Sequence, residues 1–287
     1  MTTDPTTTIG LLHPGEMGTA VGAAARTAGA RVIWCSDSRS AATLRRAGED
    51  GLEDVHWLNG LVNQSAIVLS VCPPHAALEV AEDVAGLGFR GIYVDANAIA
   101  PETARQVAAT VERSGATFVD GGIVGGPPRR AGTTRLYLSG EMAPKVARFF
   151  AGSPLETVTI DGGAGAASAL KMVYAAWTKG TTALLSAIHA VALHEGVHEA
   201  LIREWSGSQP ELLARSDRGM ASAAAKAWRW VGEMEEIARA FEAAGLPGGF
   251  HEAAAEVYRR LEPFKDDADA PGGAELARHL LHESGGR

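Results

Sequence analysis

The sequence predicts an α/β domain with a parallel sheet, followed by an all-α domain. Up to residue 162, short apolar runs rich in β-formers alternate with Ala-rich helical patterns, which is typical of a parallel sheet covered by helices on both faces. After "DGGAG" (161–165) no strand signal follows, and a nearly all-apolar helical stretch begins that must be buried among other helices. We therefore expect two domains, 1–162 and 163–287.

Each expected strand is a short apolar run bounded by Gly, Pro or polar residues. These runs cover 8–12, 31–36, 66–72, 91–97 and 117–122, and two more, 135–140 and 156–161, are expected to extend the sheet. Pro74 and Pro101 stand at the first turn of the helices that follow two of the strands, where a missing N–H costs little. In the second domain we expect a long helix over 166–196 and further helices over 198–206, 209–218, 220–244, 248–262 and 273–284.

The composition sets limits on the partners of this chain. It has 287 residues, 46% of them hydrophobic, and its net charge of −8 argues against a nucleic-acid partner, which calls for a basic face. The apolar runs are too short to span a membrane, and the polar N-terminus lacks the apolar core of a secretory signal. Cys35 and Cys72 are expected to be free thiols in a reducing cytosol. We expect a cytoplasmic protein with a small-molecule substrate and no membrane partner.

The first expected strand runs into "GLLHPGEMGTAVG" (10–22), which partly matches a dinucleotide-binding turn. In G-x-G-x-x-G, glycines let the backbone turn tightly and approach a pyrophosphate at a helix N-terminus. Gly15 and Gly18 fill the second and third positions, and His13 stands at the first. A structural βα turn is the alternative, but the place of the loop after the first strand predicts a Rossmann-type domain. The expected cofactor contacts are His13, Pro14, Gly15, Glu16 and Met17.

The end of the second strand, "WCSDSRS" (34–40), bears on the choice between NAD and NADP. An acid there hydrogen-bonds the ribose 2′-hydroxyl of NAD, whereas an Arg accommodates the 2′-phosphate of NADP. Ser36 stands at the acid's position and Arg39 follows three residues on, so the sequence favours NADP. Two alternatives stay open: a shift of one residue makes Asp37 the ribose acid, and Arg39 can be a solvated residue at a helix start.

A second motif, "HEGVH" (194–198), has the spacing by which a helix presents two histidines to zinc. The helix would have to continue through Gly196, but a glycine after a long apolar helix is the usual left-handed terminator. We expect a helix corner that turns His194 and His198 apart, and no metal site.

Four segments resemble, in order, those of the β-hydroxyacid dehydrogenases: "IGLLHPGEMG" (9–18), "VDANAIAPETA" (94–104), "FVDGGIVGGPP" (118–128) and "GAGAASALKMVYAA" (163–176). This family contains 6-phosphogluconate and 3-hydroxyisobutyrate dehydrogenases, and imine reductases are related to it. The resemblance covers residues 8 to 262, with a helical half that is only loosely similar to the better-known members. It implies a nicotinamide cofactor, hydride transfer and a substrate in the crevice between two domains.

The resemblance also implies binding residues at two strand ends. They are Cys72, Pro73 and Asn97 for the cofactor, and Asn97, Val124, Gly125 and Gly126 for the substrate. Asn97 stands at the Ser of V-D-x-S-T, and the Gly pair matches that of D-A-P-V-S-G-G. Val124 replaces a Ser that helps the family to hold a substrate carboxylate, which suggests a bulkier or less anionic substrate.

The interdomain helix of the family carries G-x-G-x-x-x-K-x-x-N-N, and this chain keeps its Lys as Lys171. Ala167 replaces the second Gly, and Tyr174 and Ala175 replace the two Asn. A later Lys-Asp pair of the family falls on residues 232–233, which are Gly and Glu here. The resemblance therefore implies Lys171 as general acid/base but leaves the usual substrates in doubt.

Lys171 and Tyr174 are the candidate catalytic residues. Hydride transfer to a carbonyl leaves an alkoxide that needs a proton, and a partly desolvated Lys in an apolar helix can supply it or remove it. Tyr174 lies three residues on, on the same helix face, where it can donate a hydrogen bond or a proton. The structural alternatives are a Lys171 stem that snorkels to the surface and a Tyr174 ring packed in the interior.

The sequence thus predicts an NADP(H)-dependent oxidoreductase that interconverts a carbonyl and an alcohol, with Lys171 as proton relay. The alternatives are an imine reductase on the same fold and a nucleotide-binding protein without turnover. A homodimer is expected, because the long apolar helix needs more cover than the remaining helices of one chain supply.

Overall fold

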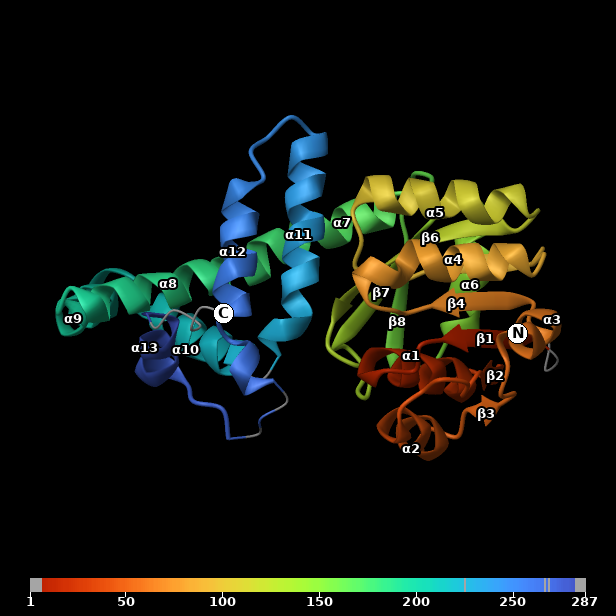
Figure 1. Cartoon of the computed structure of the whole chain (residues 1–287), viewed down its shortest axis with the longest axis horizontal. Helices are drawn as coiled ribbons and strands as arrows, with labels where there is room; N and C mark the ends of the chain where they lie inside the picture. Colours follow the sequence, from red (N-terminus) through yellow and green to blue (C-terminus); the bar gives the residue numbers. More distant parts are fainter. Residues whose placement is uncertain (1–6, 225, 266, 268, 282–287) are drawn as a thin grey trace. The chain divides into compact units, whose positions relative to one another are not determined.

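The computed structural model describes residues 7–224, 226–265, 267 and 269–281 (Figure 1). By its internal contacts the chain divides into two compact units, residues 1–172 and 173–287. The predicted boundary at 162/163 lies earlier, just before helix α7 (Ala166–Ala175), so the first turns of α7 belong to the first unit.

The first unit is built on one sheet of eight strands in the order β3-β2-β1-β4-β5-β6-β7-β8. The strands are β1 (Thr8–Leu12), β2 (Arg31–Trp34), β3 (Glu53–Asp54), β4 (Ile67–Ser70), β5 (Ile92–Asp95), β6 (Thr117–Gly125), β7 (Thr134–Ser139) and β8 (Leu155–Thr159). All neighbouring strands run parallel except β6 and β7. These two run antiparallel because a short loop joins them, whereas a parallel pair needs a long crossover. The predicted α/β fold is confirmed.

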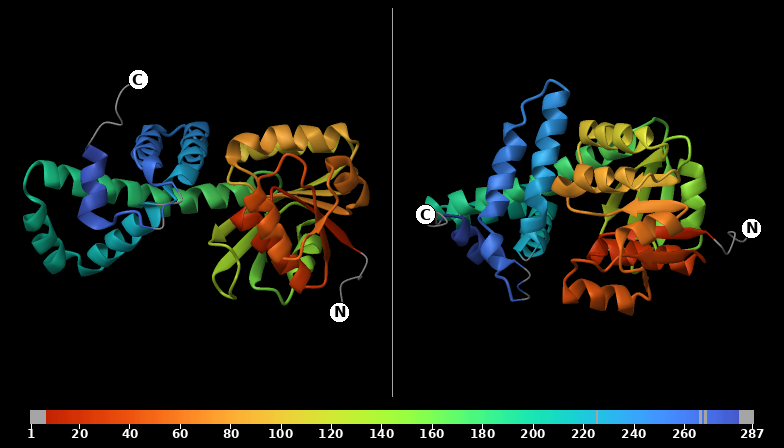
Figure 2. Two further views of the ribbon diagram at one scale, coloured as in Figure 1. Left: turned by 60° about the horizontal axis from the view of Figure 1, so that its bottom comes forward. Right: turned by 45° about the vertical axis from the view of Figure 1, so that its right-hand side comes forward.

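Helices cover both faces of the sheet, as predicted (Figure 2). They are α1 (Glu16–Thr27), α2 (Ala41–Glu49), α3 (Leu58–Gln64), α4 (Ala77–Gly86), α5 (Pro101–Arg113) and α6 (Ala143–Ala147), with short 3₁₀ turns η1 (Pro74–Ala76) and η2 (Arg148–Phe150). Alternate strand residues point to opposite faces. Ile9 and Leu11 therefore join a core with α1 and α6, whereas Val68 and Tyr93 join a second core with α3, α4 and α5.

One row of residues marks the carboxyl edge of the parallel strands. Leu12 of β1 is aligned with Ser70 of β4, Ser70 with Asp95 of β5, and Asp95 with Asp120 of β6. In open α/β sheets, ligands bind outside this edge. The polar members of the row therefore stand where a site is expected.

In the second unit, the described residues form helices joined by turns and loops, without a strand among them. α7 continues without a gap through a π-helical turn, η3 (Ala176–Gly180), into α8 (Thr181–His194), which matches the single long helix predicted there. The helices that follow are α9 (His198–Ser208), α10 (Pro210–Ala224), α11 (Ala227–Ala243), α12 (Gly249–Arg259) and α13 (Gly273–Leu281), with a 3₁₀ turn η4 (Glu262–Phe264). Residues 282–284 of the last predicted helix lie outside the described residues.

The predicted break between 218 and 220 was wrong, because α10 continues through Gly219 to Ala224. A Cβ at Gly219 would lie 3.1 Å from Oγ1 of Thr182 in α8. The glycine therefore marks a close contact between two helices and not a helix end. The break predicted at Gly196 is confirmed, since that residue has a φ of 70° between α8 and α9.

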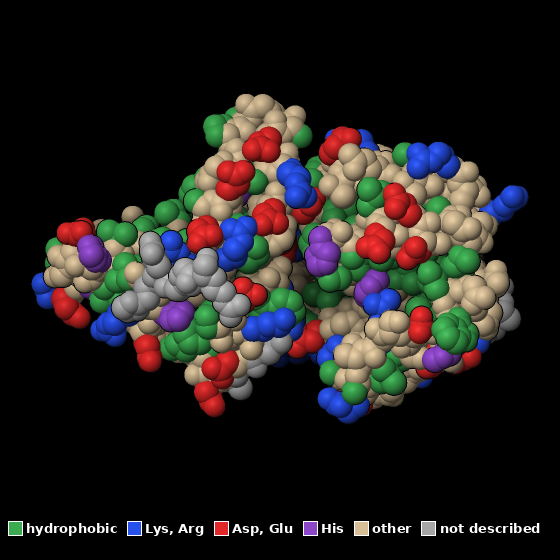
Figure 3. All heavy atoms as spheres, in the orientation of Figure 1, with side chains coloured by type: hydrophobic (Ala, Val, Ile, Leu, Met, Phe, Trp, Pro, Cys, Tyr) green, Lys and Arg blue, Asp and Glu red, His purple; other side chains and the backbone are tan. Residues whose placement is uncertain are grey.

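Among the described residues, we find no helix whose length and hydropathy would let it cross a lipid bilayer. On the face drawn in Figure 3, acidic and basic side chains are interspersed.

Candidate active site

The glycine loop joins β1 to α1 at the carboxyl edge. His13 adopts a φ of 61°, a conformation that glycine reaches without strain and that explains the usual glycine at this position. A Cβ on Gly18 would lie 2.4 Å from the carbonyl oxygen of His13, so this position accepts only glycine. At Gly22 a Cβ would come within 3.0 Å of Leu11, which fits the predicted close contact between helix and strand.

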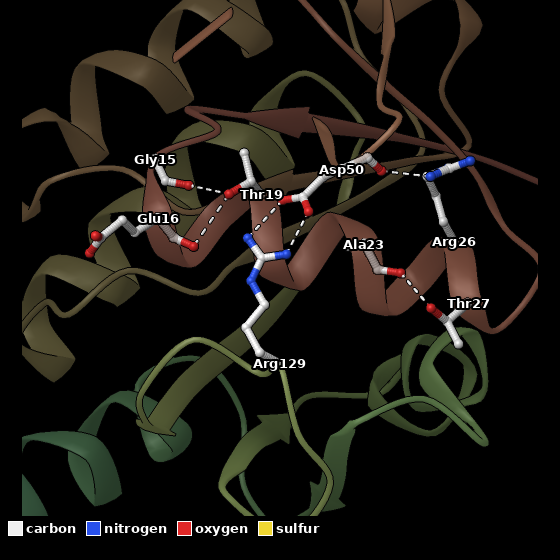
Figure 4. Close-up of polar contacts among 8 residues, drawn as sticks. All are labelled: Gly15, Glu16, Thr19, Ala23, Arg26, Thr27, Asp50 and Arg129. Atoms are coloured by element: carbon white, nitrogen blue, oxygen red, sulfur yellow. Dashed lines mark hydrogen bonds and ion pairs between the residues drawn. The ribbon is translucent and has the colours of Figure 1, made fainter. Parts of the chain in front are cut away.

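Gly15 is the N-cap of α1, and its surroundings differ from those of Gly18. A Cβ on Gly15 would meet no atom within 4 Å, and no side chain caps the helix. The Thr19 hydroxyl donates to the carbonyl of Gly15 at 2.8 Å, which stabilises the first turn from inside (Figure 4). The N-terminus of α1 thus faces open space beside Pro14, Gly15, Glu16 and Met17, as an anion site requires.

The loop after β2 brings Ser36 and Arg39 to the same edge. The Ser36 hydroxyl lies 3.0 Å from Nδ1 of His56, and the backbone N–H of Ser36 donates to the Asp54 carboxylate at 3.2 Å. Arg39 is half-buried, and its Nε has no hydrogen-bond partner within the described residues. Burial lowers the pKa of His13 to about 4, and the nearby positive charge of Arg39 contributes to this shift. His13 and Arg39 are therefore neighbours, and His13 is neutral at pH 7.

Asn97 connects two loops of the edge. Its Oδ1 accepts a hydrogen bond from the N–H of Cys72 at 2.6 Å, and its Nδ2 donates to Ser70 at 3.1 Å and to Asp95 at 2.8 Å. The side chain is 2% exposed. Asn97 therefore holds the loop of Cys72 and Pro73 in place, and its direct contact with cofactor and substrate stays a prediction.

Asp95 is a buried carboxyl that the sequence analysis did not single out. It accepts the N–H of Asn97 at 3.0 Å and lies in register with Asp120 on the next strand. Burial raises its pKa to about 7 from an ordinary 3.8, and the charge of Asp120 adds to the rise. The signal that could have found Asp95 is an acid at the last position of an apolar parallel strand.

This shift predicts a pH dependence of folding stability. Between pH 3.8 and 7 the folded chain binds more protons at Asp95 than the unfolded chain, so ionisation lowers stability as the pH rises. Below 6.5 the histidines oppose this trend, because burial lowers the pKa values of His13, His189 and His251 from their ordinary 6.5. We therefore expect the melting temperature to rise as the pH falls from about 8 to about 6.5.

The variant Asp95→Asn cannot ionise and should flatten this pH dependence. A series of thermal melts at constant ionic strength measures it. An unchanged slope in the variant would assign the effect to another group.

Lys171 lies on the part of α7 that packs against β6. A Cβ on Gly122 would lie 2.6 Å from the carbonyl oxygen of Ala167 and 3.1 Å from Cβ of Lys171, so the glycine allows the helix to approach the strand. Ser168, in the same turn, donates its hydroxyl to Asp120 at 2.6 Å. Lys171 is half-buried beside the carboxyl edge, where the resemblance requires a general acid/base.

The predicted substrate residues end β6 and begin its loop. Val124 is buried and aligned with Arg135 of β7, whereas Gly125 and Gly126 are exposed. In the loop that follows, Arg129 makes a bidentate ion pair with Asp50 at the end of α2, with Nη2 2.8 Å from Oδ2 (Figure 4). The loop after Gly126 is thus fastened to the α2 end of the unit.

The remaining predicted residues lie in the second unit. Tyr174 is 48% exposed on α7, so it is not an interior aromatic in this chain. Glu233, at the family's Lys-Asp position, forms an ion pair with Lys179 of the π-helical turn. Sequence reasoning missed this pair, because the two residues are 54 positions apart.

The two histidines of the zinc-like motif are separated by the helix corner at Gly196. Nε2 of His198 lies 2.9 Å from Nδ1 of His189. Nε2 of His194 lies 3.8 Å from a carboxylate oxygen of Glu195. Among the described residues no group of three or more His, Cys, Asp or Glu side chains has an arrangement that could hold a metal ion.

Comparisons with known proteins agree with this geometry. Residues 8–148 match the NAD-binding domain of 6-phosphogluconate dehydrogenase, and residues 192–261 match a domain of unknown function, DUF1932. An uncharacterized 28.5 kDa protein of Methanothermus fervidus is 32% identical over 174 residues, which are 60% of this chain and 65% of that protein.

Two solved structures extend the likeness to nearly the whole chain. A conserved hypothetical protein from Sinorhizobium meliloti 1021 has 25% identity and a TM-score of 0.70, with 96% of each chain covered. A 3-hydroxyisobutyrate dehydrogenase from Mycobacterium tuberculosis, solved with L-serine, has 19% identity and a TM-score of 0.69, with 96% of this chain and 98% of that chain covered. The resemblance found in the motifs is confirmed: residues 8–148 carry the NAD-binding domain of the 6-phosphogluconate dehydrogenase family, residues 192–261 carry a DUF1932 domain, and the chain shares the fold of a 3-hydroxyisobutyrate dehydrogenase.

Proposed function

We propose that this protein is an NADP(H)-dependent oxidoreductase that interconverts a carbonyl and an alcohol by hydride transfer, with Lys171 as proton relay. One observation carries the proposal. The glycine loop follows β1 at the carboxyl edge, and Lys171 packs at Gly122, just past the Asp120 that belongs to the same edge row. The glycine loop and Lys171 thus lie along one edge of one sheet, which supports a nucleotide site and a proton donor at that edge.

The residues of the first unit fit a dinucleotide. The backbone N–H groups of Glu16 and Met17, in the first turn of α1, are suited to a pyrophosphate, because Gly15 leaves the N-terminus of this helix open. Cys72, Pro73 and Asn97 are the proposed contacts at the nicotinamide end. When bound, the nicotinamide ring supplies or accepts the hydride. Both cysteines of the chain are buried free thiols, which suits work in a reducing cytosol.

NADP is favoured over NAD by the loop after β2. The buried Nε of Arg39 lacks a partner among the described residues, and a 2′-phosphate would provide an acceptor. Ser36 can donate its hydroxyl to the same group, whereas Asp37, the alternative ribose acid, is exposed. A dianion would be repelled by an acid at this position and is attracted by the Arg.

Lys171 gives the substrate oxygen its proton as the alkoxide develops, and takes it back in the oxidation direction. Tyr174 is proposed to donate a hydrogen bond to the same oxygen. Val124, Gly125 and Gly126 shape the substrate side of the site without a charged group, which suits a carbonyl compound with an apolar substituent.

Imine reduction on the same fold is the second candidate. Two departures favour it: Val124 removes a carboxylate-binding hydroxyl, and Tyr174 adds a neutral proton donor. The ammonium of Lys171 opposes it, because an ammonium beside an iminium is repulsive.

We further infer that the protein is a homodimer. The exposed hydrophobic residues of the long helix recur along it, with Trp177, Leu184 and Val191 at intervals of seven residues. A second copy would bury this stripe. Sedimentation velocity tests this inference, and a mass of one 29.8-kDa chain at micromolar concentration would refute it.

The proposed function is tested first by binding and turnover. Titration of the protein with NADPH and NADH, followed by nicotinamide fluorescence, should show tighter binding of NADPH. The holoenzyme is then assayed with a panel of aldehydes, ketones, 3-hydroxy acids and cyclic imines. Turnover of carbonyls supports the proposal, turnover of imines alone supports the second candidate, and tight binding with no turnover shows a nucleotide-binding protein without catalysis.

Arg39→Ala should weaken NADPH binding by about 10- to 100-fold, because a charged hydrogen bond contributes about 1.5–3 kcal/mol. NADH affinity should hardly change, since NADH has no 2′-phosphate. Arg45→Ala, at an exposed position of α2, is the matched control and should bind both nucleotides like the wild type. Equal losses for NADPH and NADH would mean that Arg39 does not read the 2′-phosphate.

A further inference from the structure

We infer that Asp120 is a positioning residue, whose buried carboxylate fixes the first turn of α7, and with it Lys171, against β6. Its effect on the reaction rests on the proposed role of Lys171. The contacts of Asp120 with α7, which we call the clamp, are a feature of the fold and can be tested without a substrate.

The carboxylate of Asp120 is 0% exposed and accepts two hydrogen bonds from one residue of α7. The Ser168 hydroxyl donates to Oδ1 at 2.6 Å, and the Ser168 N–H donates to Oδ2 at 3.0 Å. This N–H belongs to the first turn of the helix, where backbone donors lack partners inside the helix. A negative charge is also favourable there, because the helix dipole is positive at this end.

Ser139 of β7 holds the same turn from the neighbouring strand. Its hydroxyl donates to the carbonyl of Gly163 at 2.9 Å and accepts the N–H of Ala167 at 3.2 Å. It also lies 3.4 Å from the Asp120 carboxylate. Two side chains from adjacent strands therefore hold the chain just before and just inside the helix.

The clamp acts on Lys171 because α7 lies close to β6 at this point. A Cβ on Gly122, two residues beyond Asp120 on the same strand, would lie 2.6 Å from the carbonyl oxygen of Ala167 and 3.1 Å from Cβ of Lys171. Lys171 follows Ser168 by three residues, so it shares a face of α7 with the clamped serine. A small tilt of the first turn would move the amine along the edge.

Burying a carboxylate at the position of Asp120 costs free energy, which argues that Asp120 has a specific role there. Asp95 lies in register on the neighbouring strand, and burial raises the pKa of Asp120, whereas the hydrogen bonds from Ser168 oppose that rise. Without the donors of α7, two acids would stand side by side in the interior. The contacts with Ser168 therefore hold the helix and favour the ionised form of Asp120.

The clamp is tested with Asp120→Asn and with the milder Ser168→Ala. In Asp120→Asn an amide –NH₂ replaces one oxygen of the carboxylate. Both oxygens accept from Ser168, so one donor of Ser168 then faces another donor. The controls are Asp95→Asn, a buried acid in the same row that is hydrogen-bonded to Asn97, and Ser186→Ala, which removes a helix hydroxyl bonded to the Thr182 carbonyl. Hydrogen exchange by mass spectrometry is followed over residues 163–172.

Both clamp variants should speed amide exchange in residues 163–172, and neither control should. Trace acetylation should also report a changed reactivity of Lys171, with the exposed Lys145 as internal reference. The inference would be overturned if both clamp variants showed the same amide exchange and the same Lys171 reactivity as the wild type. If Asp120→Asn does not fold, Ser168→Ala decides alone.

Kinetics with the best substrate of the panel then separate positioning from general stability. Asp120→Asn should lower kcat by about 10²-fold, the loss expected for a misplacement of about 1 Å, with KM and NADPH affinity unchanged. When Lys171 is already replaced by Met, adding Asp120→Asn should cause no further loss of kcat. An additive loss would contradict the inference. If Lys171→Met itself keeps full turnover while the clamp variants still loosen α7, the proton relay fails and the clamp stands.

Discussion

Replacing Lys171 by methionine is expected to lower kcat for carbonyl reduction by about 10²- to 10⁴-fold and to leave NADPH affinity unchanged. Methionine keeps most of the stem that packs beside Gly122 and removes only the group that moves the proton. Because the glycine loop does not involve Lys171, the nucleotide should still bind. Steady-state kinetics in both directions, with a fluorescence titration of NADPH, measure the two effects separately.

The matched control is Lys145→Met, which removes an ammonium from an exposed position on α6. It should behave like the wild type. If Lys171→Met still oxidises alcohols at the wild-type rate, Lys171 is not the proton relay. If it loses carbonyl reduction and keeps imine reduction, Tyr174 becomes the leading proton donor and the second candidate function gains.

Gly15→Asp is expected to weaken the binding of NADPH and NADH alike by about 10²-fold or more, because a carboxylate beside a pyrophosphate costs several kcal/mol. The fold should not suffer. Gly15 has a φ of −70°, a side chain added there would find no atom within 4 Å of its Cβ, and aspartate is itself a good N-cap. The melting temperature of Gly15→Asp should therefore be unchanged or higher, although its affinity for both nucleotides falls.

Two further variants separate charge from size in this experiment. Gly15→Ala adds a methyl group without charge and should lose much less affinity. Gly48→Asp adds the same charge at an open position of α2 and should bind like the wild type. Wild-type affinity in Gly15→Asp would place the pyrophosphate elsewhere and remove the basis for a dinucleotide site at this loop.

The fold was predictable because its signals are local. The strands of the parallel sheet are buried on both faces, so each reads as an unbroken apolar run. β3 could not be predicted in this way, since it consists of two exposed acids, one of which also forms an ion pair with Arg31 of β2. Gly219 was misread for a related reason: a glycine signals either a helix end or a close contact, and only the position of Thr182 decides between them.

The site was predictable only in part, because its contacts join distant segments. The glycine loop and Lys171 are visible as motifs, but the partner of Asp120 is Ser168, 48 positions away. The direction in which Asn97 points depends on Ser70 and Cys72 of another strand end. No pattern in the sequence reports the left-handed backbone of His13 or its proximity to Arg39.

The ion pair between Arg129 and Asp50 has a mechanical consequence. It joins residues 79 positions apart and fastens the tip of the β6–β7 hairpin to the end of α2. The Arg129 side chain is 53% exposed, so dissolved salt weakens its attraction to Asp50. Raising the ionic strength is therefore expected to weaken this link between the hairpin and α2, and the 12% exposure of the Asp50 side chain limits the effect.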